Sequence, residues 1–407
     1  MIEMPDVKRP SLVFASQYIG LPSEVWMWRQ AVRFRRLSLR MLTWGYVNRE
    51  TFPLEKIEVY ELPFEFDRKT RSGRGYARIR GALVGNTWAS FGAERRVLRS
   101  YFARVNPSVL LCQFGFVALR LVDVAKESGV PVVAHFHGRD VASMLRFRPY
   151  RRSLMKNLHR FDAIVVVGTH QERWMLEHGC EAERVHLIPC GATVDPSPPE
   201  VRTQGDTVRF LAVGRLAEMK GPQYTLQAFA LVKRRVPRSS LKMVGDGPLR
   251  QDLERMAGEL GIADSVCFTG PLSPEAVRHE LIGCDVFVQH SLVVPSTGDC
   301  EGSPVALAEA AGAGLPVVST LCPGITDQVL EGITGFLVPQ RDVEGMAARM
   351  VRLAEDSGLR ASLGAAGRQR VVTCFDVNEQ VRKLEDVLIH TATGQRTSAV
   401  SMPTARR

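Results

Sequence analysis

The sequence contains no run of about eighteen apolar residues, so none of its segments is predicted to cross a membrane as a helix. Its eight cysteines occur singly, without CxxC spacing, which is typical of a reducing cytosol and argues against a disulfide framework. The first residues, MIEMPDVKRP, lack the charged and then apolar pattern of a signal peptide. Together these absences predict a cytoplasmic protein.

Motifs of two common protein classes are also missing. No GxGxxG opens a βα unit, and neither GDGPLR nor GAGLPV completes one, which argues against a nicotinamide-dependent oxidoreductase. The net charge of +10 calls for a partner or a surface, but no zinc finger or RNP-like aromatic strand supports nucleic acid in that role. We therefore expect no nucleic-acid partner.

The chain is long enough for two domains. It has 407 residues, of which 45% are hydrophobic, and can bury two substantial cores. Apolar β-branched runs alternate with longer helical patterns, which predicts the α/β class with parallel sheets. The expected strands are 11–16, 57–62, 108–112, 131–136, 163–168 and 184–189 in the first half, and 208–214, 241–245, 266–270, 285–290, 315–320 and 335–339 in the second. Residues 196–207 are rich in proline and polar groups and are the expected linker.

The stretch EGSPVALAE at 301–309 predicts a helix start that faces a ligand. Gly302 allows close approach of the backbone, Ser303 is a good N-cap, and Pro304 suits the first helical position. Free N–H groups and the positive end of the helix dipole favour a phosphate at such a start.

Two carboxylates bracket this helix start. Glu301 precedes it and is poorly placed for a phosphate, so it suits hydroxyl groups instead. Glu309 lies about a turn and a half inside the helix, where it could reach a ribose. Alternatively, both are ordinary helix carboxylates, with Glu301 interacting with the dipole and Glu309 on a solvated face.

A second stretch, FLAVGRLAEMKG at 210–221, carries two cations. An apolar strand ends on Gly214, and Arg215 and Lys220 follow at its carboxyl end, where open α/β sheets bind their ligands. Arginine offers a planar fork for phosphate oxygens and lysine a flexible point charge. The pair suits a diphosphate, and the alternative is a solvated basic loop.

In this order, VGRLAEMKG, VGDGPLR, VCFTGPLS, DCEGSPVALAEAAGAGLPVVST and GFLVP resemble a retaining glycosyltransferase of family four with the two-domain GT-B fold. The resemblance extends into the first half through PVVAHFHGRD at 131–140 and FDAIVVVGTH at 161–170. The HFHGRD form is similar to the subgroup that builds exopolysaccharide and capsule repeat units.

The resemblance implies roles for individual residues. Arg215 and Lys220 would bind the donor diphosphate, Glu309 the ribose hydroxyls and Glu301 the transferred sugar. The remaining donor contacts would come from the backbone of Gly302, Ser303, Pro304 and Val305 and from the main chain near Leu272, which would meet the base.

His137 would face the donor sugar from the first domain, so that His137 and Glu301 are the expected catalytic residues. The alternative for His137 is a core histidine at the end of a buried strand. His135 shares its strand face, but no third ligand with suitable spacing accompanies the pair, so we expect no metal site.

The resemblance also implies an organisation. Residues 1–195 would form an N-terminal Rossmann-like acceptor domain and residues 208–375 a C-terminal Rossmann-like donor domain, facing a central cleft. Residues 376–392 would be a helix that crosses back to the first domain. Residues 393–407 have the composition of a disordered basic tail.

The expected reaction is transfer of a sugar, with retention, from a UDP or GDP type of nucleotide sugar to a saccharide or lipid-linked saccharide acceptor. No cofactor or metal is expected, because Arg215, Lys220 and the helix start would stabilise the leaving diphosphate. A nucleotide-sugar epimerase, or a non-catalytic nucleotide-sugar binding protein of the same fold, is the alternative.

Positive charge is concentrated at residues 28–104, with 17 Lys and Arg against 7 Asp and Glu. Within and just before this region, WMWRQAVRFRRLSLRMLTW at 26–44 is a candidate helix that mixes arginines with tryptophans. Such a helix could lie on an anionic membrane at the inner face of the cell membrane. It could equally be a core-packing helix with one solvated basic face.

Overall fold

The computed structural model describes residues 9–65, 85–195 and 207–394. It divides the chain into two compact units, residues 1–189 with 378–407, and residues 190–377. The sequence analysis placed the domain boundaries at 195 and 375. The expected linker at 196–207 and the expected tail at 393–407 fall almost entirely outside the described residues.

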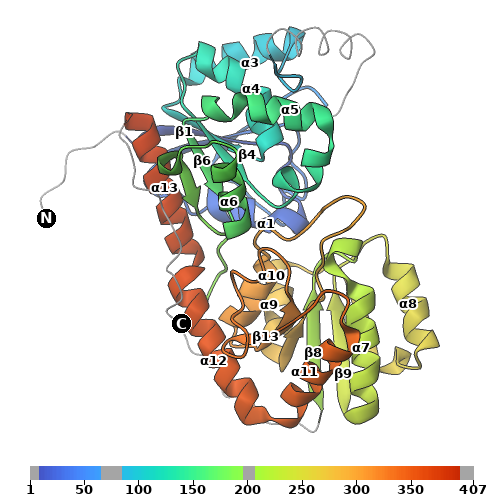
Figure 1. Cartoon of the computed structure of the whole chain (residues 1–407). Helices are drawn as coiled ribbons and strands as arrows, with labels where there is room; N and C mark the ends of the chain where they lie inside the picture. Colours follow the sequence, from blue (N-terminus) through green and yellow to red (C-terminus); the bar gives the residue numbers. More distant parts are fainter. Residues whose placement is uncertain (1–8, 66–84, 196–206, 395–407) are drawn as a thin grey trace, which may run out of the picture. The chain divides into compact units, whose positions relative to one another are not determined.

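A parallel sheet with the order β3-β2-β1-β4-β5-β6-β7 forms the centre of the first unit (Figure 1). Its strands are β1 Ser11–Ser16, β2 Ser38–Thr43, β3 Glu58–Glu61, β4 Val109–Gln113, β5 Val132–Phe136, β6 Ala163–Val166 and β7 Val185–Leu187. The helices of this unit are α1 Val25–Ala31, α3 Gly92–Val105, α4 Gly115–Glu127, α5 Arg148–Asn157, α6 Thr169–Glu177 and α13 Val377–Thr393.

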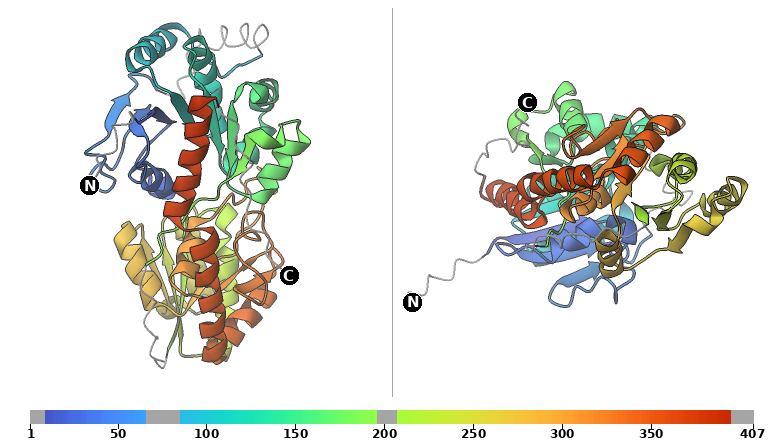
Figure 2. Two further views of the ribbon diagram at one scale, coloured as in Figure 1. Left: turned by 90° about the vertical axis from the view of Figure 1, so that its left-hand side faces the viewer. Right: turned by 90° about the horizontal axis from the view of Figure 1, so that it is seen from below.

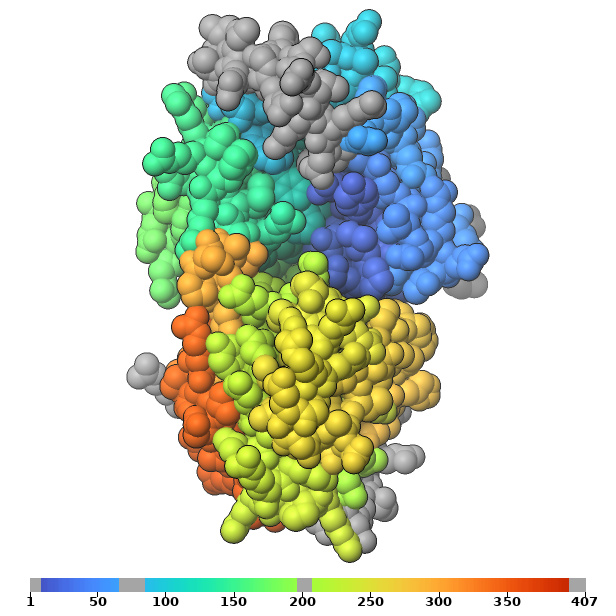
Figure 3. All heavy atoms as spheres, turned by 90° about the vertical axis from the view of Figure 1, so that its right-hand side faces the viewer, coloured from blue at the N-terminus to red at the C-terminus, as the bar shows by residue number. Residues whose placement is uncertain are grey.

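The second unit repeats the scheme with the strand order β10-β9-β8-β11-β12-β13. Its strands are β8 Val208–Val213, β9 Ser239–Val244, β10 Val266–Gly270, β11 Val286–Val288, β12 Val317–Thr320 and β13 Gly335–Val338. Its helices are α7 Pro222–Arg235, α8 Arg250–Glu259, α9 Pro274–Gly283, α10 Val305–Gly312, α11 Val343–Glu355 and α12 Ser357–Cys374. In Figure 3, α8 lies in yellow on the surface of this unit.

Both sheets follow from the apolar runs in the sequence. Strands β4, β5 and β6 are buried along their whole length, as parallel strands covered on both faces require. In the second unit, Phe210, Phe229 and Leu241 belong to one buried cluster between the sheet and its helices. A strand lies at each of the expected positions, and the predicted α/β class with two doubly wound parallel sheets is confirmed.

The prediction of one helix over residues 26–44 is wrong. Helix α1 ends at Ala31, and residues 38–43 form β2, which pairs with β1 on one side and β3 on the other. The reason is tertiary, because Met41 and Leu42 are fully buried as strand residues between two partners. The segment is therefore not a long amphipathic helix that could lie on a membrane.

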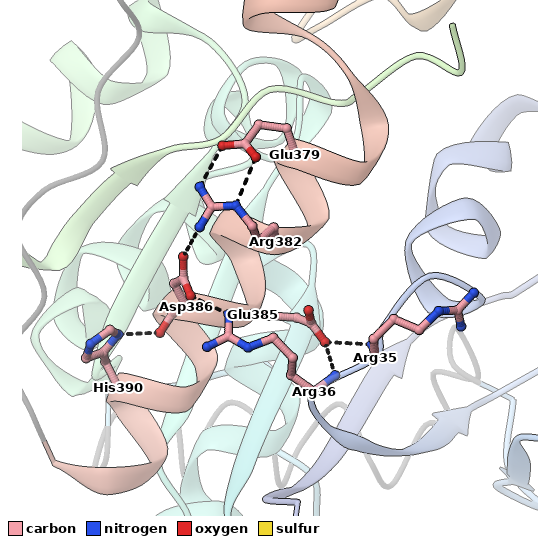
Figure 4. A network of polar contacts seen from close by, with 7 residues as sticks. All are labelled: Arg35, Arg36, Glu379, Arg382, Glu385, Asp386 and His390. Carbon is pink, nitrogen blue, oxygen red and sulfur yellow. Dashed lines mark hydrogen bonds and ion pairs between the residues drawn. The ribbon is translucent and has the colours of Figure 1, made fainter. Parts of the chain in front are cut away.

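The C-terminal helix α13 belongs to the first unit, along which it lies in Figures 1 and 2. Figure 4 shows how it is held. The buried carboxylate of Glu385 accepts hydrogen bonds from the backbone N–H groups of Arg35 and Arg36, at 2.8 and 2.7 Å. Asp386 on the same helix accepts from the side chains of Arg36 and Arg382 at 2.5 and 3.0 Å.

Candidate functional site

The strand order of the second unit creates a crevice between β8 and β11. The chain turns from β8 towards β9 on one side, and β11 then continues the sheet on the other. Ligands bind in open α/β sheets at such a switch point, beyond the carboxyl ends of the strands. A ligand site is therefore expected among the residues that follow β8 and β11.

Three of those residues converge on Glu301. Its Oε1 accepts hydrogen bonds from Lys220 Nζ at 2.7 Å, Ser291 Oγ at 2.8 Å and Gln289 Nε2 at 3.0 Å. Only 5% of Glu301 is exposed, so an unpaired carboxylate here would be costly and Lys220 provides its counter-charge. The structure thus brings together two of the predicted site residues, Lys220 and Glu301.

The loop after β8 is shaped by glycine. Gly221 has φ +52°, and a Cβ atom there would lie 2.0 Å from the backbone oxygen of His290. This close contact ties the end of the Lys220 turn to the segment after β11. A small cavity of about 20 Å³ between them is lined by residues that include Gly214, Arg215, Lys220 and Gln289.

Arg215 lies at this cavity with an exposed side chain, which forms no ion pair with the described residues. Gln289 Oε1 is buried and has no hydrogen-bond partner in the described parts of the chain. The cavity therefore offers the solvated guanidinium of Arg215 and the unsatisfied acceptor Gln289 Oε1. It also offers the ammonium of Lys220, which has further N–H donors besides the one that it gives to Glu301.

The helix start after Glu301 differs in one detail from the expectation. Helix α10 begins at Val305 with Pro304 as its N-cap residue, and no side chain caps it. The expected N-cap, Ser303, instead has its hydroxyl at 3.1 Å from Gln328 Nε2. Ser303 lies one residue before the N-cap, and its side chain binds the segment after β12 through Gln328 instead of capping the helix.

Gly302 is held by close backbone packing. A Cβ atom at Gly324, which has φ +79°, would lie 2.4 Å from the carbonyl oxygen of Gly302. The first turn of α10 leaves backbone N–H groups without helical acceptors. The partly exposed residues Ser303 and Val305 bring this turn to the surface.

The two other predicted donor residues lie on separate elements. Glu309 is partly exposed within α10, more than one turn after the helix start. Leu272 is partly exposed between β10 and α9, just before Ser273, which caps α9 by accepting from the N–H of Ala276 at 3.2 Å.

His137 belongs to the first unit and follows β5. The residue is 6% exposed, and its ring packs against Trp26 with centroids 3.9 Å apart and lies 5.0 Å from the ring of Phe114. Nε2 is 2.9 Å from Gln113 Oε1, an acceptor, so Nε2 carries the proton. Burial holds the pKa of His137 well below its usual value, so the ring is neutral.

The turn after His137 is fixed by Asp140. This fully buried carboxylate accepts from the backbone N–H of His137 at 2.8 Å and of Gly115 at 2.9 Å. Burial raises the pKa of Asp140 to about 7, although the backbone donors oppose the shift. A Cβ atom at Gly115 would lie 2.4 Å from Phe136 and 2.6 Å from the hydroxyl of Tyr150, which explains the glycine.

A second perturbed carboxylate lies in the loop between β1 and α1. Burial raises the pKa of Glu24 to about 7, and the charge of Arg139 opposes the shift. Trp26, two residues further on, is the ring that packs on His137. The first loop and the His137 turn thus share one polar and aromatic neighbourhood in the first unit.

Sequence reasoning missed the partners of both predicted catalytic residues. Gln289 and Ser291 hold Glu301, and Gln113 and Asp140 hold the His137 turn. For Gln289, Ser291 and Asp140 the sequence signal was polar residues directly after a strand, in QHS after β11 and HGRD after β5, whereas Gln113 is the last residue of β4. Their convergence depends on strand order, which the sequence does not display.

Within residues 9–65, 85–195 and 207–394 no group of three or more His, Cys, Asp or Glu side chains is placed to hold a metal ion. In the same residues no helix is long and apolar enough to cross a membrane.

Comparison with known proteins agrees with this arrangement. The family model described as Glycosyltransferase Family 4 matches residues 60–196, and the model described as Glycosyl transferases group 1 matches residues 195–370. The two matches meet at the junction between the two units, and the second contains the Lys220–Glu301 cluster.

Individual relatives are moderately similar. The chain is 31% identical over 277 residues to the GDP-mannose-dependent alpha-(1-6)-phosphatidylinositol monomannoside mannosyltransferase of Mycolicibacterium smegmatis, covering 65% of this chain and 72% of that protein. It is 26% identical over 286 residues to the amylovoran biosynthesis glycosyltransferase AmsK of Erwinia amylovora, covering 69% of each.

The fold is shared with solved structures. HepE of Anabaena, solved in complex with UDP and glucose, matches with a TM-score of 0.72 at 18% identity, over 93% of this chain and 99% of that one. Two parallel α/β units of this kind form the GT-B architecture. From its matched models and relatives, the chain belongs to the family 4 glycosyltransferases and has the GT-B fold.

Proposed function

We propose that the enzyme transfers a sugar from a nucleoside diphosphate sugar, of the UDP or GDP type, to a saccharide or lipid-linked saccharide, with retention of configuration. The Lys220–Glu301 cluster at the β8–β11 switch point carries this proposal. It combines a cation for the diphosphate with a buried carboxylate suited to sugar hydroxyls. The UDP and glucose bound in the HepE structure are the two parts of such a donor, and the GDP-mannose named for the mycobacterial relative is a donor of this class.

The residues act on the leaving diphosphate. One N–H of the Lys220 ammonium donates to Glu301, and the other two can donate to a phosphate oxygen. Arg215 adds a guanidinium, and the free N–H groups of the α10 start add their dipole. Together these groups stabilise the charge that develops as the bond from the anomeric carbon to the phosphate oxygen breaks.

In this proposal the acceptor hydroxyl attacks from the face that the diphosphate leaves, and its proton passes to the departing phosphate oxygen. Glu301 orients the transferred sugar, and neutral His137, whose Nε2 proton is donated to Gln113, contributes a hydrogen-bond acceptor at the sugar. The reaction then needs neither a cofactor nor a metal ion. We expect activity to persist in EDTA, and an inverted product anomer would refute the proposed stereochemistry.

The proposed setting is cell-surface polysaccharide biosynthesis at the inner face of the cell membrane. Amylovoran biosynthesis, named for one relative, and a phosphatidylinositol mannoside acceptor, named for another, support saccharide and lipid-linked acceptors respectively. An epimerase or a silent binding protein is not favoured by relatives that are named as transferases.

Donor binding tests the proposal directly. We expect UDP or GDP, but not ADP or NAD, to raise the melting temperature of the wild-type protein. The shift should be lost in the double variant Arg215→Ala, Lys220→Gln, in which glutamine keeps a donor for Glu301. The matched control is Arg234→Ala, Arg235→Ala, which removes the same charge from exposed positions at the far end of α7. A shift that survives in the first variant would place the nucleotide elsewhere.

Catalysis is tested by product release. Release of nucleoside diphosphate only when an acceptor is supplied supports a transferase. Conversion of the nucleotide sugar without an acceptor would support an epimerase instead, and binding without either reaction would support a silent protein.

A further inference from the structure

Helix α5 and the residues before it carry an unusual surface. We name it the α5 basic face, and it consists of Arg146, Phe147, Arg148, Arg151, Arg152, Met155 and Lys156, all exposed. From residue 141 to residue 161 the sequence has six Lys and Arg and no Asp or Glu. Figure 1 shows α5 at the outside of the first unit, beside α4.

The helix is amphipathic, with its apolar side turned inward. Tyr150 and Leu154 are fully buried, and Ser153 and Asn157 complete the inner side. The cations therefore project from the opposite side.

Four of these cations form no ion pair within the described parts of the chain. The described residues show no ion pair for Arg148, Arg151, Arg152 or Lys156, whereas Arg160 at the end of the helix pairs with Asp123 at 2.6 Å. Like charges on one helix face repel one another, and solvated surfaces usually mix both signs. An uncompensated cluster of this kind suits an anionic partner.

The arginines of residues 28–44, which the sequence analysis considered for this role, are differently placed. Arg29 is 8% exposed, Arg36 pairs with Asp386, and Arg40 pairs with Glu58 at 2.9 Å. Two of the five arginines are therefore paired with carboxylates and a third is buried, which leaves the α5 basic face as the stronger candidate.

Apolar side chains within the α5 basic face favour lipid over nucleic acid. Phe147 is 46% exposed and Met155 37% exposed, although both belong to residue types that are usually buried. The partly exposed ring of Trp88 lies beside Phe147 at 6.5 Å. Cations together with aromatic and apolar side chains on one helix face are typical of segments that lie in a membrane interface.

We propose that the α5 basic face docks the first unit on an anionic lipid surface. This inference rests on the proposed location at the membrane and assigns it to particular residues. The buried Tyr150 of α5 reaches Gly115, whose N–H is held by Asp140, the residue that also fixes the turn at His137. Docking through α5 therefore places the lipid surface one helix away from the site that would receive a lipid-linked acceptor.

The test is co-sedimentation of the full chain with vesicles of phosphatidylglycerol and phosphatidylcholine, or of phosphatidylcholine alone. We expect binding only to the anionic vesicles, weakened by salt. Each basic residue near such a surface contributes about fivefold to partitioning, so the triple variant Arg148→Ser, Arg151→Ser, Arg152→Ser should bind about 100-fold more weakly. Phe147→Ser should weaken binding as well, without altering the salt dependence.

The matched control removes the same charge from α3 of the same unit. Its triple variant, Arg96→Ser, Arg99→Ser, Arg104→Ser, changes exposed residues and should bind vesicles nearly as well as the wild type. An equal loss in both triple variants would show attraction by net charge alone and overturn the assignment to α5. Unchanged fluorescence of the five tryptophans establishes that each variant is folded.

Other outcomes separate this inference from the proposed function. If the wild type fails to bind anionic vesicles but still binds a nucleoside diphosphate, the docking proposal fails and the donor site stands. If the α5 variant loses binding to a single-stranded oligonucleotide and the wild type ignores vesicles, the partner is nucleic acid and the lipid proposal is wrong.

Discussion

Removal of the Glu385 carboxylate is expected to lower the stability of the first unit, because this side chain joins the C-terminal helix to the N-terminal part of that unit. Glu385 is 3% exposed and joins α13 to the turn before β2 by accepting two backbone N–H groups, from Arg35 and Arg36 (Figure 4). These donors lie 350 and 349 residues away in sequence. Glu385→Ala removes both hydrogen bonds at once.

The magnitude follows from the chemistry of the acceptor. A hydrogen bond to a charged group contributes about 1.5 to 3 kcal/mol, and two are lost. Arg35 and Arg36 are themselves exposed, so water can reach their freed N–H groups and reduce the loss. We expect the free energy of unfolding of the first unit to fall by about 3 kcal/mol.

The neighbouring carboxylate provides the control. Asp386 is 29% exposed at its side chain and pairs with Arg36, which is 46% exposed, so Asp386→Ala should cost less than about 1 kcal/mol. All five tryptophans lie between residues 26 and 174, so denaturant unfolding followed by tryptophan fluorescence reports the first unit alone. Equal midpoints for Glu385→Ala and Asp386→Ala would refute the reasoning that the buried acceptor matters more than the exposed ion pair.

Three further predictions concern both units. Gly115→Ala should destabilise the first unit by about 1 to 3 kcal/mol, because its Cβ would collide with Phe136 and Tyr150. The midpoint of denaturant unfolding measures this loss, and an unchanged midpoint would contradict the packing argument. Ser291→Ala should weaken nucleotide-sugar binding while leaving a folded protein, because one of the hydrogen-bond donors that orient Glu301 is lost. Calorimetric titration with the nucleotide sugar measures the affinity, and an unchanged affinity would contradict this prediction. Burial lowers the pKa of His290 to about 4, so between pH 6.5 and 4 the unfolded chain takes up a proton that the folded protein does not, and stability falls as pH falls. His290→Gln should flatten this slope, by up to about 1.4 kcal/mol per pH unit, in urea titrations across that range, and an unaltered slope would exclude His290 as its source.

Local patterns in the sequence were sufficient for most of the fold. Uninterrupted β-branched runs such as AIVVVG mark strands buried on both faces, and the structure has β6 there. The exception is β2, whose residues SLRMLT mix arginine with apolar side chains and follow a helix closely. Only pairing with β1 and β3 makes that segment a strand.

The candidate site was predictable in part for the same reason. Lys220 and Glu301 stand in local motifs, after a strand and before a helix, and the structure joins them. Gln289 and Ser291 were not predictable, because they reach Glu301 only when β11 is placed beside β8. Similarly, Ser303 had the sequence of an N-cap, but packing against Gln328 decided its role.

The sequence by itself determined the alternation of strands and helices, the positions of the cations after β8 and the glycine-rich start of α10. These depend on side-chain periodicity and backbone preferences that act over a few residues. The tertiary structure decided which polar groups share Glu301, which arginines are paired within the first unit, and which remain exposed on α5. Such choices depend on contacts between residues far apart in the chain, and only strand order and packing bring those residues together.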